Sequence, residues 1–438
     1  MNTNEKYALA DMVIDHALKN GAQQVSVSID ESRSNNIEIR DQKIDSLKES
    51  NRSGLTVDLY VDNKYSSSST NRLKKEDILK FTGEAIAATK YLAEDQFRKL
   101  PEPELYYKGG GADLGLYDKK LESVDAKAKI DLASQVMNEA FGKDERIISV
   151  SSYYNDSLNN RLMVTSNGFR GDSQKSNLSL VASVSMKSDT GRPSDYWYES
   201  SVFFDKLIKN DIGKKALERT IRKLGPKKIA SGKYPMILEN RIAPNLLNPV
   251  YSSLQGGAIY RKESFLIGKK DKQVASKLMT VWDDPAIAGG SGSRLFDNEG
   301  LASVKRVIFE EGMLRDYYID NYYGSKLGMK PTSGDASNIV FKLGTRDMNA
   351  MVSSLKKGIL ITGFIGGNFN GSTGDFSYGI EGFLVENGKL VQPVNEMNIS
   401  GNMNDIWMRL VEVGNDIIES SSQKVPSLML DAIDFSGI

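Results

Sequence analysis

The side chains most often used for catalysis, histidine and cysteine, are nearly absent from this chain. Its 438 residues contain no cysteine and one histidine, His16. His16 stands one turn before the end of an expected first helix, where a neighbouring carboxylate and the helix C-terminus favour a protonated imidazole. We interpret it as a surface residue. One histidine cannot complete the three-protein-ligand zinc sites of hydrolases unless carboxylates supply the remaining ligands.

Serine and lysine offer only weak nucleophile patterns. Ser353 and Lys356 have the spacing of a serine–lysine dyad, but both residue types are common here and the segment reads as an amphipathic helix. The segment Gly371-Ser372-Thr373-Gly374 merely resembles a nucleophile elbow, which requires G-x-S-x-G. Neither pattern specifies a catalytic nucleophile.

Three carboxylates stand in or beside glycine-rich segments. Asp297 and Glu299 belong to residues 288–300, and Asp375 belongs to residues 366–382. A metal site built from them would need a hard cation such as magnesium or calcium, and nothing else in the sequence specifies one. The glycines suit either tight turns or a groove wall that another backbone approaches closely, and both readings stay open.

Composition excludes several classes of protein. Lysine plus arginine and aspartate plus glutamate number 57 each, so no net charge favours direct binding to nucleic acid or to an anionic membrane. Without cysteine no disulfide framework points to secretion, and the N-terminus lacks the basic start and apolar run of a signal peptide. No stretch approaches ~18 uninterrupted apolar residues. We expect a cytoplasmic protein.

Periodicity predicts an α+β fold with two parts. Residues 1–228 are expected to form an N-terminal α/β domain in which helices flank antiparallel strands. The order helix–strands–helix occurs twice, in residues 1–100 and 118–228. The expected helices cover residues 4–19, 74–92, 123–141 and 206–224, and the expected strands cover residues 25–29, 36–40, 54–61, 64–69, 147–154, 161–166, 177–186 and 196–204.

Residues 229–438 are expected to form a β-rich C-terminal domain, because glycine becomes dense and short strands meet at tight turns. Hairpins are predicted at Glu311-Gly312 and Asn387-Gly388, and an earlier one at Asp62-Asn63. The helices expected here cover residues 244–255, 320–327 and 348–355. Within the first of them, Asn248 can cap a helix that has Pro249 at its first position and ends before Gly256.

Several C-terminal segments resemble the TldD/PmbA family, also described as modulators of DNA gyrase. They are "GGAIYRKESF" (residues 256–265), "FDNEG" (residues 296–300), the long run from Gly371 to Met403 and "VGNDI" (residues 413–417). The resemblance implies an α/β N-terminal part and a β-rich C-terminal part around a substrate channel. It also implies two kinds of member. TldD-type chains bind zinc through a His-Glu-x-x-x-His helix and a later cysteine, whereas PmbA-type chains, also called TldE, lack these residues and assemble with TldD into a peptidase.

Aligning the zinc helix by the "R-K-x-S" that follows it places the two histidine positions at Leu247 and Ser252. The glutamate position falls at Asn248. None of these side chains is suited to the corresponding role, because leucine has no lone pair to donate, asparagine is no base and serine is a poor zinc ligand. The resemblance therefore implies a PmbA-type chain with no catalytic residue and no metal of its own, zinc being expected in a TldD-type partner.

The function predicted is that of a non-catalytic, PmbA/TldE-like subunit of a TldD-type zinc metallopeptidase, within a homo- or hetero-oligomer that binds a peptide substrate. Two alternatives stay open: a regulatory protein acting on DNA gyrase, and a self-standing hydrolase that uses aspartate, serine or lysine. The residues expected to line a peptide groove are Gly256, Gly257, Tyr260, Arg261, Asp297, Asp375 and Ser377.

Overall fold

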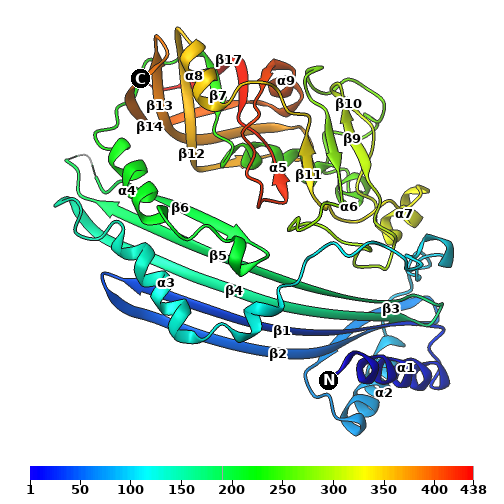
Figure 1. Cartoon of the computed structure of the whole chain (residues 1–438). Helices are drawn as coiled ribbons and strands as arrows, with labels where there is room; N and C mark the ends of the chain where they lie inside the picture. The colour runs from blue at the N-terminus through cyan, green and yellow to red at the C-terminus, as the bar shows by residue number, and fades with distance from the viewer. Residues whose placement is uncertain (190, 438) are drawn as a thin grey trace.

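The computed structural model describes residues 1–189 and 191–437, and within them the chain has the predicted α+β fold class. The N-terminal half builds one long, curved antiparallel sheet in the order β3-β2-β1-β4-β5-β6 (Figure 1). Its strands are β1 (Gln24–Arg40), β2 (Lys43–Val61), β3 (Lys64–Thr70), β4 (Ile147–Thr165), β5 (Arg170–Met186) and β6 (Ser194–Ser201). Because β1 pairs with β4, the two helix–strands–helix units share this single sheet.

The strands are longer than the apolar alternation predicts. The predicted strands leave out the polar stretches 30–35, 155–160 and 170–176, which continue β1, β4 and β5 without a break. Their backbones stay paired in register, with Asp30 opposite Arg161 and Arg161 opposite Ser173. Once the apolar residues at both ends fix the register, the polar residues between them complete the hydrogen-bond ladder.

Four helices cover one face of this sheet: α1 (Thr3–Lys19), α2 (Lys75–Thr89), α3 (Ala126–Asn138) and α4 (Ile212–Arg222). The first two pack over one end of the sheet, around residues such as Val27 and Leu59, and the other two pack over the opposite end, around Ile37 and Leu180. Val27 and Ile37 both occupy odd positions of β1, so both cores lie on the same face. The even positions of β1 therefore belong to the face without helices.

The C-terminal half contains two further sheets that share a large apolar core. One has the order β14-β13-β12-β7-β17-β15, and an additional pairing of β14 with β17 closes it on itself. Its strands are β7 (Gly232–Leu238), β12 (Lys357–Phe369), β13 (Asp375–Glu386), β14 (Lys389–Asn402), β15 (Leu410–Val413) and β17 (Leu428–Ser436). The other has the order β10-β9-β8-β11-β16. Its strands are β8 (Val281–Asp283), β9 (Arg306–Glu310), β10 (Met313–Leu314), β11 (Ile339–Phe341) and β16 (Gln423–Lys424).

Short helices connect these strands. The α-helices are α5 (Ala243–Ser253), α6 (Gly256–Tyr260), α7 (Asn321–Leu327), α8 (Met348–Ser354) and α9 (Met403–Ile406). The 3₁₀ turns of the whole chain are η1 (Pro103–Leu105), η2 (Lys119–Ser123), η3 (Phe204–Lys206) and η4 (Trp407–Arg409). No helix in the described ranges is long and apolar enough to cross a membrane.

The predicted hairpin turns are confirmed. Asp62-Asn63, Glu311-Gly312 and Asn387-Gly388 each connect paired strands, and both residues of every pair have positive φ. Consecutive left-handed residues match the right-handed twist of the flanking strands, which is why these dipeptides are strong turn signals.

Two helix starts were predicted wrongly. Helix α4 begins at Ile212, not near residue 206, where the chain forms only a 3₁₀ turn and a loop. Asn248 does not cap a helix, because α5 already begins at Ala243 and contains Pro249 in its interior. Leu246, Leu247 and Val250 bury one side of α5 in the C-terminal core, and this packing outweighs the hydrogen bond that an internal proline removes.

Candidate functional site

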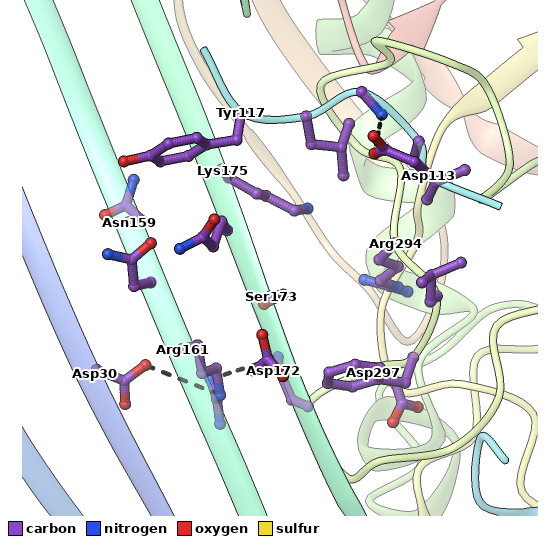
Figure 2. A pocket seen from close by; sticks show the side chains of 18 of the residues that line it. Asp30, Asp113, Tyr117, Asn159, Arg161, Asp172, Ser173, Lys175, Arg294 and Asp297 are labelled. Carbon is purple, nitrogen blue, oxygen red and sulfur yellow. Dashed lines mark hydrogen bonds and ion pairs between the residues drawn. The ribbon is translucent and has the colours of Figure 1, made fainter. Parts of the chain in front are cut away.

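A cavity of about 850 Å³ separates the helix-free face of the N-terminal sheet from loops of the C-terminal half. One wall comes from the middle of β1, β4 and β5, and the other from residues 112–117 and 294–298 (Figure 2). This volume lies in the range of typical small-molecule and cofactor sites. The cavity is therefore the first candidate for a functional site.

The sheet wall consists of two cross-strand rows of polar side chains. One row joins Asp30, Arg161 and Ser173, and the next joins Ser32, Asn159 and Lys175. These residues lie two apart along each strand, so their side chains share a face, and that face is opposite the apolar positions under the helices. The continuous polar strands thus place a charged surface in the cavity (Figure 2).

Arg161 connects the two walls. Its guanidinium Nε lies 3.9 Å from Oδ1 of Asp30 on the neighbouring strand, and its Nη1 donates to Oδ1 of Asn298 at 3.3 Å. Asn298 belongs to the loop of the C-terminal half. The side chain of Arg161 thereby contacts both the sheet wall and the loop wall of the cavity.

The loop wall contains Arg294 and Asp297. Nη2 of Arg294 donates to the Ser333 hydroxyl at 3.0 Å and to the backbone carbonyl of Asp335. Oδ1 of Asp297 accepts two backbone N–H bonds, each 2.9 Å long, from residues 299 and 301. Burial raises the pKa of Asp297, although these N–H donors and the charge of Arg294 oppose the rise.

Glu299 sits behind this loop, at the junction of the two halves. Burial raises its pKa from 4.5 to about 8, and the negative charges of Asp297 and Asp320 add to the effect. The backbone N–H of Asn321 donates to its Oε2 at 2.8 Å, and that bond and the charge of Arg98 oppose the rise. A carboxyl in this environment is neutral at neutral pH.

The three positions that the sequence analysis predicts to match the zinc helix of TldD-type chains lie on α5. Leu247 is fully buried in the C-terminal core, whereas Asn248 and Ser252 are exposed. Oδ1 of Asn248 accepts a hydrogen bond from Gln423 at 3.2 Å, and the Ser252 hydroxyl donates to the carbonyl of Pro249 at 2.9 Å. These donor groups do not fit a zinc ion, which takes imidazole, thiolate or carboxylate ligands.

Four of the predicted groove residues belong to α6 and its end. A Cβ on Gly256 would lie 2.9 Å from Cβ of Tyr323, and one on Gly257 would lie 3.0 Å from Cε2 of the Tyr323 ring, so both glycines permit α6 to pack against α7. The Tyr260 ring lies 5.9 Å from that of Tyr323. Arg261 forms a 2.7 Å ion pair with its neighbour in sequence, Glu263. These contacts are internal, and the two glycines have a packing role.

The remaining predicted groove residues lie in two different places. Asp297 lines the cavity, whereas Asp375 accepts hydrogen bonds from Thr373 at 2.6 Å and from Asn402 at 2.8 Å at the exposed start of β13, where Ser377 is also exposed. The structure therefore does not gather Asp297 and Asp375 into one metal site. Across residues 1–189 and 191–437, no group of three or more histidine and acidic side chains is arranged to hold a metal.

The serine–lysine pattern also lacks the geometry of a dyad. The Ser353 hydroxyl donates to the backbone carbonyl of Asn349 at 2.8 Å, within α8. No bond between Ser353 and Lys356 occurs in the described part of the chain. The single histidine, His16, is on α1, where its carbonyl accepts a 2.7 Å bond from Asn20.

Sequence reasoning missed most of the cavity. Asp30, Arg161, Lys175 and Arg294 were not singled out, because the first three stand in or at the edge of polar stretches that looked like breaks between strands. The available signal was that each such stretch is bounded by strand-like alternation on one or both sides. Aligned in a sheet, polar stretches of this kind make a polar patch on an otherwise apolar scaffold.

Three sequence models cover most of the chain: PmbA/TldA metallopeptidase domain 1 over residues 25–89, the central domain over residues 119–224 and the C-terminal domain over residues 231–437. Among curated relatives, a Haemophilus influenzae protein named metalloprotease PmbA homolog is 30% identical, over 97% of this chain and 94% of its own. The Escherichia coli O157:H7 metalloprotease PmbA is 26% identical, over 94% and 92%.

Solved structures agree over the full length. A Bacteroides thetaiotaomicron protein assigned as a modulator of DNA gyrase superposes with a TM-score of 0.98 at 46% identity and covers 100% of both chains. TldE from Thermococcus kodakarensis has the same fold, with a TM-score of 0.87 at 16% identity, covering 98% of this chain and 100% of its own. This chain belongs to the PmbA/TldD family of metallopeptidase-related proteins.

Proposed function

We propose that this chain is a non-catalytic, PmbA/TldE-like subunit of a peptidase whose zinc ion is held by a TldD-type partner. The observation that carries the proposal is the chemistry of α5. By the predicted alignment, a buried leucine and an exposed serine stand at the two histidine positions, and an asparagine stands at the glutamate position. Catalysis of hydrolysis by zinc requires ligands that hold the ion and a base that takes a proton from water.

The hydrogen bonds of α5 support the same reading. The amide of Asn248 accepts from Gln423, and the hydroxyl of Ser252 is engaged with the helix backbone. Leu247 contributes to the apolar core that holds α5 against the C-terminal sheets. Leu247 is therefore part of the core, and a histidine in its place would disturb that packing.

The contribution of this subunit to proteolysis would be the binding and presentation of the peptide. The cavity between the two halves has polar side chains on its sheet wall, apolar ones on its loop wall and a volume typical of ligand sites. An extended peptide bound there could use main-chain hydrogen bonds, which give affinity with little sequence preference, and side-chain contacts for orientation.

Reconstitution tests the proposal. The chain is purified alone and together with a homologue that carries the His-Glu-x-x-x-His helix, and hydrolysis of an unfolded peptide is measured with zinc present. We expect no hydrolysis by the chain alone, co-elution of the two subunits in size-exclusion chromatography, and hydrolysis by the pair that exceeds that of the homologue alone.

Hydrolysis by the chain alone would refute the proposal, and hydrolysis that persists in the presence of a chelator would support a self-standing hydrolase that uses aspartate, serine or lysine. A lack of co-elution, with no change in the homologue's activity, would refute it as well. In that case a binding role such as regulation of DNA gyrase would be tested next. The affinity of the chain for DNA would be measured at increasing salt concentration, because binding through the phosphates of DNA weakens steeply as salt rises.

A further inference from the structure

Lys175 extends into the cavity from β5 without a counter-ion (Figure 2). In the described ranges, no carboxylate lies within ion-pair distance of its Nζ, and its Nζ donates no hydrogen bond. Burial lowers the pKa of Lys175, and the positive charge of Arg294 across the cavity lowers it further. Two cations are therefore placed close enough to repel each other, which is unfavourable unless an anion joins them.

Arg294 also lacks an acidic partner at ion-pair distance among the described residues. Its guanidinium is held by neutral acceptors, the Ser333 hydroxyl and the carbonyl of Asp335. Asp297 is the nearby acid on the same loop, but Oδ1 of Asp297 is occupied by two backbone N–H groups and burial raises its pKa. The guanidinium of Arg294 is thus fixed in direction and forms no ion pair among the described residues, although the carboxyl of Asp297 lies near enough for the two charges to interact.

The other acids of the lining already have partners. Asp30 faces Arg161 at 3.9 Å, and Glu31 accepts an ion pair from Lys6 at 2.6 Å. Two more accept hydrogen bonds: Asp172 from Tyr7 at 3.0 Å and Asp113 from a backbone N–H at 2.8 Å. Each of these four acids thus has an ion pair or a hydrogen bond, whereas Lys175 has neither among the described residues, so an anion is the partner that Lys175 lacks.

We infer that Lys175 and Arg294 form a subsite for a carboxylate of the bound peptide, either its C-terminal carboxylate or the side chain of an aspartate or glutamate. The inference rests on the proposed function, because it assumes that the cavity receives a peptide. A carboxylate between an ammonium and a guanidinium forms charge-assisted hydrogen bonds, which are about twice as strong as neutral ones. It would also remove the repulsion between the two cations.

Peptide titrations with the full chain alone test the subsite. Three probes are compared by NMR-detected titration at neutral pH: N-acetyl-penta-alanine with a free C-terminus, the same peptide as its C-terminal amide, and that amide with a central glutamate. We expect the free acid, the glutamate peptide or both to bind about ten-fold more tightly than the neutral amide, which corresponds to the lower end of hydrogen bonds to charged groups. The probe that gains affinity identifies the source of the carboxylate.

Variants then assign the effect to the cavity. Lys175→Gln should bind the acidic peptide only as tightly as the neutral one, and Lys175→Glu should bind it more weakly still. Lys206→Gln, which alters a lysine lining a different cavity of about 520 Å³, should leave the preference unchanged. Circular dichroism and thermal unfolding check that each variant is folded, as expected for a side chain that packs in no core.

Equal affinity of the wild-type chain for all three probes would overturn the carboxylate subsite and leave the proposed function in place. A preference that persists in Lys175→Gln and in Arg294→Gln would overturn it too. The titrations need neither a partner nor hydrolysis, so a failure of the partner experiment would refute the proposed function without affecting their result.

Discussion

Glu299 gives the junction between the two halves a pH dependence that can be calculated in advance. Its carboxyl is largely buried, and burial raises its pKa from 4.5 to about 8. Between these two values the unfolded chain has lost the proton that the folded chain retains. Each rise in pH in that window therefore favours unfolding, and the stabilisation present below about pH 4.5 is lost as pH rises towards 8.

The substitution Glu299→Gln replaces the titrating carboxyl with an amide that does not ionise. The glutamine oxygen can still accept the N–H bond of Asn321, so the contact at the junction is kept. The wild-type chain should lose stability relative to the variant by ~1.4 kcal/mol per pH unit, or roughly 3 kcal/mol between about pH 5 and about pH 7. Asp297 and Asp320 have raised pKa values as well, but they are present in both proteins and largely cancel in the difference.

Urea unfolding at several pH values between about 5 and 7 measures the effect through the difference in free energy of unfolding. The matched control is Glu84→Gln, which alters a glutamate on the exposed side of α2 and should give a curve parallel to that of the wild type. If the curves for Glu299→Gln and the wild-type chain also run parallel, Glu299 is ionised in the folded protein and the account of the junction is wrong.

Two further predictions concern packing. Arg219 pairs with the buried carboxylates of Asp195 at 3.1 Å and Glu239 at 2.6 Å, so Arg219→Met should lower the free energy of unfolding by ~3–5 kcal/mol. The control Lys127→Met, which removes an exposed ion pair, should change it by less than ~1 kcal/mol. Gly256→Ala brings a methyl group against the tyrosine of α7 and should destabilise by ~1–3 kcal/mol, whereas Gly83→Ala, in open space on α2, should stabilise by ~0.5–1 kcal/mol. Urea unfolding measures both pairs, and equal effects within a pair would contradict the contacts described.

Local signals predicted the parts of the fold that depend on neighbouring residues. The hairpin turns at Asp62-Asn63 and Asn387-Gly388 follow from the ease with which these residues adopt positive φ. The helices expected over residues 4–19 and 320–327 lie at residues 3–19 and 321–327, and the structure adds the capping side chains Asn2 and Asp320. These features need no knowledge of the rest of the chain.

Features that depend on contacts between residues far apart in the chain could not be predicted from local sequence signals. The polar middle of β1 is a strand because its register is fixed by apolar residues on both sides and by β4, far along the chain. Pro249 lies inside α5 because the buried leucines around it hold the helix in the C-terminal core. The cavity itself is formed by strands and a loop more than a hundred residues apart, so no local pattern marks Lys175 and Arg294 as neighbours.

The central claim is that any catalytic zinc belongs to the partner and none to this chain. The most direct measurement is peptide hydrolysis by the reconstituted complex after glutamine replaces the glutamate of the partner's His-Glu-x-x-x-His helix. Loss of all hydrolysis, with the complex still assembled, is the predicted result, because Leu247, Asn248 and Ser252 supply neither a zinc ligand set nor a base. Hydrolysis that survives this substitution would place a catalytic centre in the present chain and contradict the account.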